Sequence, residues 1–592
     1  MLRGIFRTKN LDDILAVAGG PQFALKRTLG PLNITLLGIG AIIGAGIFAT
    51  VGTAAAGDAS RPGAGPSLML SFVITAIVCG FTALCYAEFA SMVPISGSAY
   101  TYSYATLGEL VAWIIGWDLI IEYAVGNVAV AISWANYFRT LMDGVGIHIP
   151  AWLGTDYRTA AKLAETNPTG YAEQFGSAPH LFGHAIIFNV LAFGIVALIT
   201  IVLVWGIKES AEFNAGMVMV KIIVLLFFIG MALYYVSPSK MMVNYHPFQP
   251  TGWHGTLAAA AVVFFAYIGF DAVSTVAEEC KNPARDLPIG IIASLAICTV
   301  FYVVVAAVFT GIIPYNELVQ KLSNEQAEPL TMALSHVAPQ GVTWPSTIVA
   351  FGSVVAHTAV LLVFQLGQPR IFFSMARDGL LPSVFASVHP RFKTPHVTTI
   401  ITGVLVGGFA TFMSIDEMVD LTNIGTLFAF VLVCVGIIIL RYKDPQRKRP
   451  FRVPFGPWLF PLLGAVSCFF LMYYLPPASW WRFVGWLVLG LSIYTSFGYT
   501  HSAIGMKMGR PTRAPFPLKL ASLGFLSTAI GLFTIPHDAG PKTLWHEAMT
   551  AGTDDHNRAL IGLALIALGL LLGIVGSVAG SSQNANGTGD AS

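Results

Sequence analysis

The sequence predicts an all-α polytopic membrane protein, and two observations lead to this fold class. Of the 592 residues, 55% are hydrophobic and only 10% are charged, whereas soluble domains carry about 25% charged residues. Apolar runs long enough to cross a bilayer, which takes about 20 helical residues, follow one another along the chain. We therefore expect about 14 membrane spans, centred near residues 45, 80, 122, 195, 224, 265, 301, 360, 405, 430, 464, 490, 526 and 569.

These spans divide the chain into four expected parts. A cytoplasmic N-terminal segment (1–32) precedes a ten-helix core (33–442), accessory membrane helices follow (443–580), and a polar tail (581–592) is predicted to be disordered. Most lysines and arginines fall on one side of the bilayer in this arrangement, which places both termini in the cytoplasm. A cleaved signal peptide is not expected, because no small-residue cleavage site follows the first charges. The six cysteines show no pairing framework, so neither disulfides nor a metal site are expected.

Lys221 is the only charge in the apolar run from Phe213 to Val236. An ammonium near the middle of a span costs about 2.5 to 3.5 kcal/mol on insertion scales, and lipid offers it no hydrogen bond. Such a residue is by default a candidate for binding or moving charge. The alternative is a lysine that reaches an interface, which is difficult from mid-span, or that pairs with a carboxylate.

Two spans contain glycines where a membrane helix would otherwise be continuous. The first span has glycines at 38, 40, 44, 46 and 52, and each weakens a helix by about 1 kcal/mol. The sixth span has Gly269 near its middle. Interrupted helices in corresponding positions point to a transporter's binding site, which predicts two five-helix repeats near 33–236 and 254–441. Close helix packing is the alternative for the glycines, and the absence of a preceding strand excludes a dinucleotide fingerprint.

Motifs along almost the whole chain support this interpretation. They are LKRTLG with GIGAIIGAGIF (25–48), YAEFASMVPISGSAYTY (86–102), GWDLIIEYAVG (116–126), GFDAVSTVAEECKNPARDLPIGI (269–291), GQPRIFFSMARDGLLP (367–382), FRVPFGPW (451–458) and WRFVGWLVLGLSIYTSFGYTHS (481–502). On these motifs the chain resembles the amino acid–polyamine–organocation superfamily, and within it the cationic amino acid transporter family in a bacterial form. The resemblance implies a LeuT-like 5+5 inverted-repeat core with broken helices 1 and 6, plus about four C-terminal helices.

The resemblance also implies the location of a substrate site. The carboxylate of an amino acid would meet the first-span backbone at Ile42, Ile43, Gly44, Ala45 and Gly46, because a half-helix N-terminus offers free N–H groups. Its amine would meet carbonyls of the sixth span at Phe265, Ala266, Ile268 and Gly269. Lys221 stands where proton-coupled relatives hold a lysine in place of a sodium ion. Its expected partner is a backbone carbonyl between Gly38 and Ile42.

Other polar residues within the spans are weaker candidates. Glu122 of the third span matches an acidic residue of bacterial relatives and is a candidate for the substrate path, unless it pairs with a helix end or another span. His357 and Thr358 lie on the eighth span, where relatives shape the side-chain pocket. The alternative for His357 is a hydrogen bond to a neighbour. Asp118, one turn before Glu122, is expected to be structural.

The sixth span also carries candidate gates. Aromatic gates are predicted among Phe264, Phe265 and Phe270, with lipid-facing side chains as the alternative. Glu88 at the end of the second span is predicted to be structural. An ionic latch at the inner gate is expected from Asp271, Glu278 and Glu279 with Lys281 and Arg285.

Three classes of function are compared. A secondary transporter explains the paired breaks, the intramembrane lysine and the motifs. A non-transporting amino acid sensor could use the same pocket, but such proteins usually add a long cytoplasmic domain. A membrane enzyme is not expected, because no catalytic motif such as HExxH or GxSxG occurs. Within transport, proton symport and amino acid exchange stay open, and Lys221 favours protons because burial disfavours the charged form of an amine.

The expected partners are a small amino acid and the lipid bilayer, with no nucleic acid. No cofactor and no metal are expected, and the proton is the expected coupling ion. We predict a multi-pass protein of the plasma (inner) membrane. A small accessory span, a homo-oligomer and the choice between neutral and cationic amino acids stay open.

Overall fold

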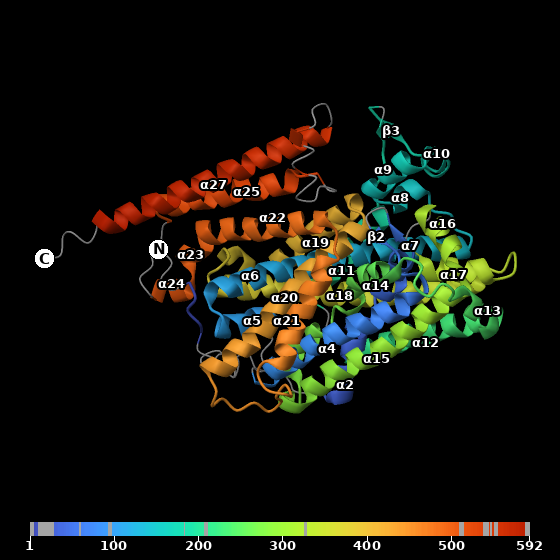
Figure 1. Cartoon of the computed structure of the whole chain (residues 1–592), viewed down its shortest axis with the longest axis horizontal. Helices are drawn as coiled ribbons and strands as arrows, with labels where there is room; N and C mark the ends of the chain where they lie inside the picture. Colours follow the sequence, from blue (N-terminus) through green and yellow to red (C-terminus); the bar gives the residue numbers. More distant parts are fainter. Residues whose placement is uncertain are drawn as a thin grey trace.

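Long helices lie side by side through most of the molecule (Figure 1). The computed structural model describes residues 5–9, 29–58, 61–92, 98–182, 184–206, 211–324, 328–507, 514–536, 544, 548–549 and 554–586. Its longer elements in the first half are α2 (Pro31–Ile42), α3 (Val51–Ala56), α4 (Leu68–Met92), α5 (Ser98–Thr106), α6 (Glu109–Ile120), α7 (Gly126–Gly144), α11 (Val190–Trp205) and α12 (Ala211–Tyr235). In the second half they are α14 (Gly252–Val263), α15 (Pro283–Ile312), α18 (Trp344–Arg377), α19 (His396–Phe412), α20 (Ile415–Lys443), α21 (Leu459–Tyr473), α22 (Pro477–Ile493), α25 (Phe516–Thr534) and α27 (Asp554–Asn586).

Shorter elements connect these helices. The short helices are α8 (Ala151–Gly154), α9 (Tyr157–Thr166), α10 (Pro168–Phe175), α13 (Pro238–Asn244), α16 (Tyr315–Asn324), α17 (Pro329–Val337), α23 (Tyr499–His501) and α24 (Ala503–Lys507). Two hairpins of two-residue antiparallel strands pair β1 (Gly57–Asp58) with β2 (Arg61–Pro62) and β3 (His180–Leu181) with β4 (His184–Ala185).

The membrane-spanning character of the chain follows from the length and composition of its helices. Within the described residues, ten helices are long and apolar enough to cross a bilayer, or up to eleven if the bent pair α2 and α3 counts as one span. Three shorter apolar helices, Val190–Trp205, His396–Phe412 and Leu459–Tyr473, lie where further spans are predicted. The fold class of a helical polytopic membrane protein is confirmed, and the number of about 14 spans stays a prediction.

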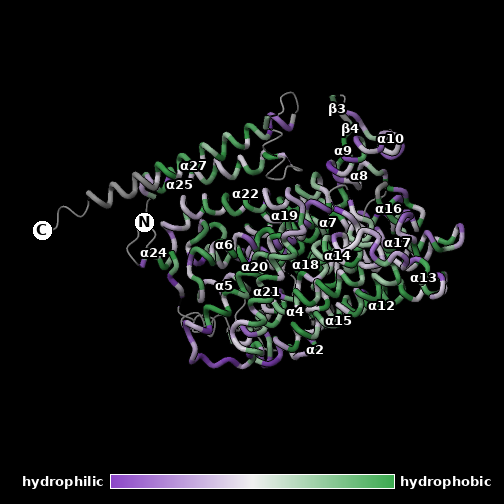
Figure 2. The backbone as a smooth tube through the Cα atoms, in the orientation of Figure 1, coloured by the Kyte–Doolittle hydropathy of each residue, from purple (hydrophilic) through white to green (hydrophobic). Residues whose placement is uncertain are grey.

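Hydrophobic residues occupy most of the long helices (Figure 2). Hydrophilic residues gather toward the two ends of the bundle, for example around α9 and α10 at one end and in the connection between α20 and α21 at the other. This distribution suits a bundle whose middle lies in lipid and whose ends lie in water.

Buried ion pairs join helices at both ends of the bundle. At the end that carries β1 and β2, the Arg61 guanidinium donates to Asp58 at 2.9 Å and to Asp420, near the start of α20, at 2.6 Å. At the opposite end of α20, the guanidinium of Arg441 forms an ion pair with Glu88 of α4. Glu88 also accepts the Val453 N–H at 2.7 Å, which supports its predicted structural role.

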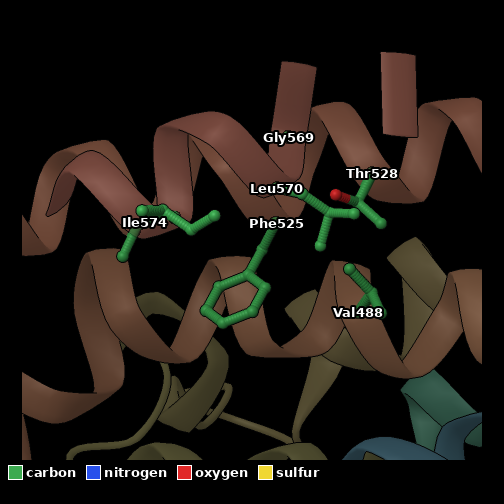
Figure 3. A pocket seen from close by; sticks show the side chains of 8 residues that line it. Val488, Phe525, Thr528, Gly569, Leu570 and Ile574 are labelled. Atoms are coloured by element: carbon green, nitrogen blue, oxygen red, sulfur yellow. The ribbon is translucent and has the colours of Figure 1, made fainter. Parts of the chain in front are cut away.

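The last two helices, α25 and α27, form a pair that lies along α22 at the edge of the bundle (Figure 1). A Cβ added at Gly531 would lie 2.6 Å from the Gly562 carbonyl oxygen, and one at Gly524 would lie 2.6 Å from that of Gly569. Small residues let membrane helices approach this closely. A groove of about 430 Å³ lies between α22, α25 and α27, with Phe525, Ile574 and other apolar side chains as its lining (Figure 3).

The end of the chain differs in part from its prediction. The last helix continues to Asn586, which is beyond the start of the predicted disordered tail at 581. An apolar stretch of good helix formers extends into small residues there without a helix-ending proline. Residues 587–592 lie outside the described residues.

Candidate substrate and ion site

The first predicted break is present in the structure. Helix α2 ends at Ile42, Ile43 is extended with φ −74° and ψ 103°, and the chain resumes with a π-helical turn at Gly46–Thr50 before α3. The two helical parts are bent by 41°. A break of this kind releases backbone N–H and C=O groups from helical hydrogen bonds. Every residue from Ile42 to Gly46 is buried, so these groups lie in the protein interior.

The sixth span is interrupted as well. Helix α14 tightens into a 3₁₀ turn at Phe264–Tyr267, and Ile268 is extended with φ −59° and ψ 132°. Gly269 has φ +122°, which L side chains rarely adopt, and a second 3₁₀ segment follows at Asp271–Glu279. Glycine is needed at Gly269 for this backbone conformation.

The two breaks lie directly against each other. A Cβ added at Gly46 would lie 2.2 Å from the Ala266 Cα, and one at Gly269 would lie 2.8 Å from the Ala41 carbonyl oxygen. Backbone therefore touches backbone at the crossing, and the candidate residues Ile42–Gly46 and Phe265–Gly269 form one buried region. The structure brings together these two groups of predicted substrate-site residues.

Lys221 lies next to this buried region, and its ammonium group binds backbone carbonyls of the first span. Its side chain is fully buried on α12, and its Nζ donates to the Gly40 carbonyl at 2.6 Å and to the Ile43 carbonyl at 2.9 Å. Gly40 lies within the predicted range of partners, and Ile43 lies one residue beyond it. No described carboxylate forms an ion pair with Lys221. Carbonyl oxygens at a helix end and in the unwound segment that follows it are the kind of ligands that hold coupling ions in membrane transporters.

Two polar side chains that the sequence did not single out also bind the broken backbone. The Tyr302 hydroxyl of α15 is 2.9 Å from both the Ile42 and the Ala266 carbonyl oxygens. The Asn423 amide of α20 donates to the Ala261 and Val262 carbonyls at 2.9 and 3.1 Å. The sequence shows both as polar residues inside apolar spans, which could have marked them as candidates. It does not show which backbone groups they contact.

Glu122 lies in a π-helical turn of the third span, at Ile121–Val125. Glu122 is 2% exposed, and Asp271, which follows the break in the sixth span, is 1% exposed. Asp118 is also buried, and neither of its carboxylate oxygens accepts a hydrogen bond from the part of the chain that the structure describes. Among the described residues Asp271 forms no ion pair with Lys281 or Arg285 in this conformation, and its Oδ1 accepts the Gly269 N–H at 3.2 Å.

Near the expected latch, backbone hydrogen bonds connect the first and sixth spans. The Leu29 N–H donates to the Glu279 carbonyl at 3.0 Å, and the Lys281 N–H donates to the Leu29 carbonyl at 2.9 Å. These bonds tie the start of the first span to the end of the sixth. Arg285 is exposed, and the side chain of Glu278 lies outside the described residues.

His357 and Thr358 are held by neighbouring helices. The His357 Nδ1 is 2.6 Å from the Ser353 carbonyl oxygen and must donate to it, so Nε2 accepts from the Ser133 hydroxyl at 2.7 Å. The Thr358 hydroxyl donates to Val354 and accepts from Trp134. His357 also packs on Phe48, with ring centroids 5.9 Å apart, which places it beside the first-span break.

The predicted gate residues Phe264 and Phe270 are fully buried and share one neighbour. Their rings lie 5.6 and 5.1 Å from the ring of Phe430 on α20. The two aromatic side chains therefore fix the halves of the sixth span against α20 in this conformation.

Two interrupted spans that enclose a buried lysine bound to backbone carbonyls are typical of membrane transport proteins of the permease class. The sequence comparisons give the particular family: the chain belongs to the amino acid permease family, whose sequence profile matches residues 29–497. The predicted membership in the amino acid–polyamine–organocation superfamily is thereby confirmed. The family consists of transporters and not of enzymes.

Individual relatives are similar over most of the chain. It is 45% identical over 504 residues to "Branched-chain amino acid permease BcaP" of Bacillus subtilis, covering 85% of this chain and 100% of that one. It is 42% identical over 503 residues to "Methylthioribose transporter" of the same organism, with the same coverage. It is 35% identical over 447 residues to the vacuolar "Cationic amino acid transporter 4" of Arabidopsis thaliana, covering 75% of this chain and 68% of that one.

Proposed function

We propose that this protein is a secondary active amino acid transporter that takes up its substrate together with protons by alternating access. The observation that carries the proposal is the buried Lys221 ammonium on the carbonyls of Gly40 and Ile43. A charge-assisted hydrogen bond is roughly twice as strong as a neutral one. Loss of the lysine proton would therefore loosen the first-span break, which links protonation to the shape of the site.

The substrate site of this proposal is the crossing of the two breaks. Free N–H groups around Gly44–Gly46 at the start of a helical segment suit the substrate carboxylate. Carbonyls of the sixth span around Phe265–Ile268 suit its ammonium. The core then corresponds to the predicted LeuT-like 5+5 inverted repeat in the plasma (inner) membrane, with both termini cytoplasmic.

The side chain of the substrate is proposed to be neutral and apolar. A Cβ at Gly44 would lie 2.7 Å from the Val360 Cγ2, and Phe48 lies beside His357, so apolar atoms surround the first break. The polar atoms of His357 and Thr358 already bind their neighbours. The relative named as a branched-chain amino acid permease supports the same substrate class.

Proteoliposomes with an imposed pH gradient test this proposal. A thermal-shift screen across the amino acids first identifies ligands, and leucine is the expected hit with arginine as the contrasting probe. The wild type should accumulate labelled leucine when the outside is acidified. Lys221→Ala should lose this accumulation but retain part of its leucine counterflow, because substrate contacts come mainly from backbone.

The matched control is Lys240→Ala, which removes an exposed lysine of α13. It should accumulate leucine as the wild type does. Accumulation by Lys221→Ala at the wild-type level would refute coupling through this lysine. Counterflow without any gradient-driven accumulation in the wild type would refute symport and favour the exchanger.

A further inference from the structure

A groove of about 610 Å³ opens between the start of α15 and the connection that joins α20 to α21. Its lining on the α15 side reaches from Asn282 to Ala296, and Pro450 and Phe451 of the connection complete it. The fourteen residues from Asn282 to Ala296 correspond to about 21 Å of helix. The groove therefore begins at the polar start of α15 and continues into its apolar part.

The apolar part of the groove faces the outside of the bundle. Ile289 and Ile292 line it and are exposed large hydrophobic side chains. Val300 and Val304, further along the same helix, are exposed as well. Because α15 is long and apolar enough to cross a bilayer, this exposed face contacts lipid, and a hydrocarbon chain can enter the groove from the side.

A cationic rim lies at the polar end of the groove and consists of Lys281, Arg285, Lys448 and Arg452. Arg285 lines the groove, and each of the others is within two residues of a lining residue. All four are exposed, and none forms an ion pair with a described residue. Two further arginines of the connection are already engaged, Arg447 by Asp444 at 3.5 Å and Arg449 by backbone carbonyls.

Nearby carboxyl groups do not neutralise this rim. Asp286 is buried, and its Oδ2 accepts the Asn282 N–H at 3.1 Å. Even if Glu278 and Glu279, which precede Lys281, are both counted against the four cations, positive charge is in excess. The rim therefore suits an anionic group.

Aromatic side chains place the connection at the membrane surface. Phe455 is 76% and Trp458 52% exposed, and the Trp458 ring lies 5.5 Å from that of Tyr442. Tryptophan and tyrosine are enriched where a bilayer meets water. The cationic rim, which belongs in part to the same connection, is thus expected at the level of lipid headgroups.

Both sides of the groove are held by hydrogen bonds to other spans. The Phe451 N–H donates to the Ser91 hydroxyl of α4 at 3.3 Å. The Lys281 N–H donates to the Leu29 carbonyl at 2.9 Å. A site that is formed before its ligand arrives loses less conformational entropy on binding.

We propose that this groove binds an anionic phospholipid, with the phosphate group on the cationic rim and one acyl chain along Pro288, Ile292 and Ala296. The rim selects the headgroup by charge, and burial of the chain against the apolar lining adds affinity that a soluble anion cannot gain. The lipid would connect the start of α15 to the segment after α20, which is far away in the sequence. This inference goes beyond the proposed function and does not rest on it, because lipid binding is measured without transport.

Native mass spectrometry of the full-length protein in detergent tests the proposal, with phosphatidylglycerol and phosphatidylcholine of identical acyl chains as probes. The wild type should retain phosphatidylglycerol more tightly. Arg285→Gln and Arg452→Gln should each weaken its binding about fivefold, which is the contribution expected of one cation near an anionic headgroup. Lys519→Gln is the matched control, because it removes an exposed cation at the start of α25, outside the groove, and should bind as the wild type does.

A second pair of variants tests the apolar part. Ala296→Phe fills the groove without changing charge and should weaken phosphatidylglycerol binding at least as much as the loss of one cation. Ile297→Phe changes the next residue, which is exposed but does not line the groove, and should have no effect. Glycerol phosphate, which has the phosphate group without acyl chains, should not displace the lipid. Melting temperatures close to that of the wild type show that the variants are folded.

Three results would overturn the inference. The first is equal retention of the two lipids by the wild type, and the second is an effect of Lys519→Gln as large as that of Arg285→Gln. The third is displacement by glycerol phosphate or unchanged binding in Ala296→Phe, which would make the rim a site for a soluble anion or an acidic protein segment. Absence of leucine transport with preserved lipid selectivity would contradict the proposed function alone.

Discussion

Gly46→Ala tests the backbone crossing on which the substrate site depends. The added Cβ would lie 2.2 Å from the Ala266 Cα and 2.7 Å from the Ala266 backbone nitrogen. Carbon atoms in contact prefer about 3.5–4.0 Å, so the two segments would have to separate by roughly 1.5 Å. Neither side can yield by rotating a side chain, because the clashing atoms are the Cα, the Cβ and the backbone nitrogen of Ala266.

The expected cost follows from this separation. Overpacking a close-packed interior by one methyl group costs about 1–3 kcal/mol, and a ligand that bridges both segments would lose roughly tenfold affinity for every 1.4 kcal/mol. Gly46→Ala should therefore lower the melting temperature in detergent and weaken or abolish the thermal shift produced by leucine.

Gly230→Ala is the matched control for this change. Gly230 lies on α12, the helix of Lys221, and an added Cβ would meet no heavy atom within 4 Å. Alanine is the better helix former, so this variant should be at least as stable as the wild type. Wild-type melting and leucine binding in Gly46→Ala would refute the direct contact between the two broken spans.

The other predictions concern the ends of the bundle. Arg441→Met removes one of the two arginines that pair with the buried Glu88, while Arg449 stays at 3.4 Å. It should cost up to about 3 kcal/mol, seen as a lower melting temperature that a Glu88→Gln, Arg441→Met double variant partly restores. An equal loss in the double variant would contradict this. Burial raises the pKa of the Asp156 carboxyl, the N-cap of α9, to about 7. This is above its value in the unfolded chain, so its ionised form opposes folding and stability should fall as pH rises from about 4 to 7. Asp156→Asn should flatten the dependence of the melting temperature over that interval, and an unchanged pH profile would show that another group causes it.

The positions of the helix breaks could be predicted from the sequence because they are local properties. Five glycines within one apolar span weaken that span wherever it lies, and Gly269 marks the sixth span by its backbone freedom. Lys221 could likewise be identified, since a charge in an apolar run is visible without any partner. A backbone carbonyl could be predicted as the partner of Lys221 because a broken helix is the nearest source of free acceptors.

Contacts between spans could not be predicted in the same way. Asp271 was expected to join the cations that follow it along the chain, but in the structure its Oδ1 accepts the Gly269 N–H at the break. Tyr302 and Asn423 are ordinary polar residues in their own spans, and only the packing of α15 and α20 shows that they bind the broken backbone. The number of spans stays open, because helices such as Val190–Trp205 are shorter than a typical crossing.

Tyr302 imposes a choice on the two broken spans. Its single hydroxyl hydrogen can point to the Ile42 carbonyl or to the Ala266 carbonyl, although both oxygens are 2.9 Å away. At any moment, therefore, one of the two carbonyl oxygens lacks the hydrogen bond from Tyr302. An ammonium group arriving at the crossing would donate to the oxygen that Tyr302 leaves. A bound ammonium group would therefore stabilise the packed arrangement of the two broken spans, and substrate binding would favour closure of the site.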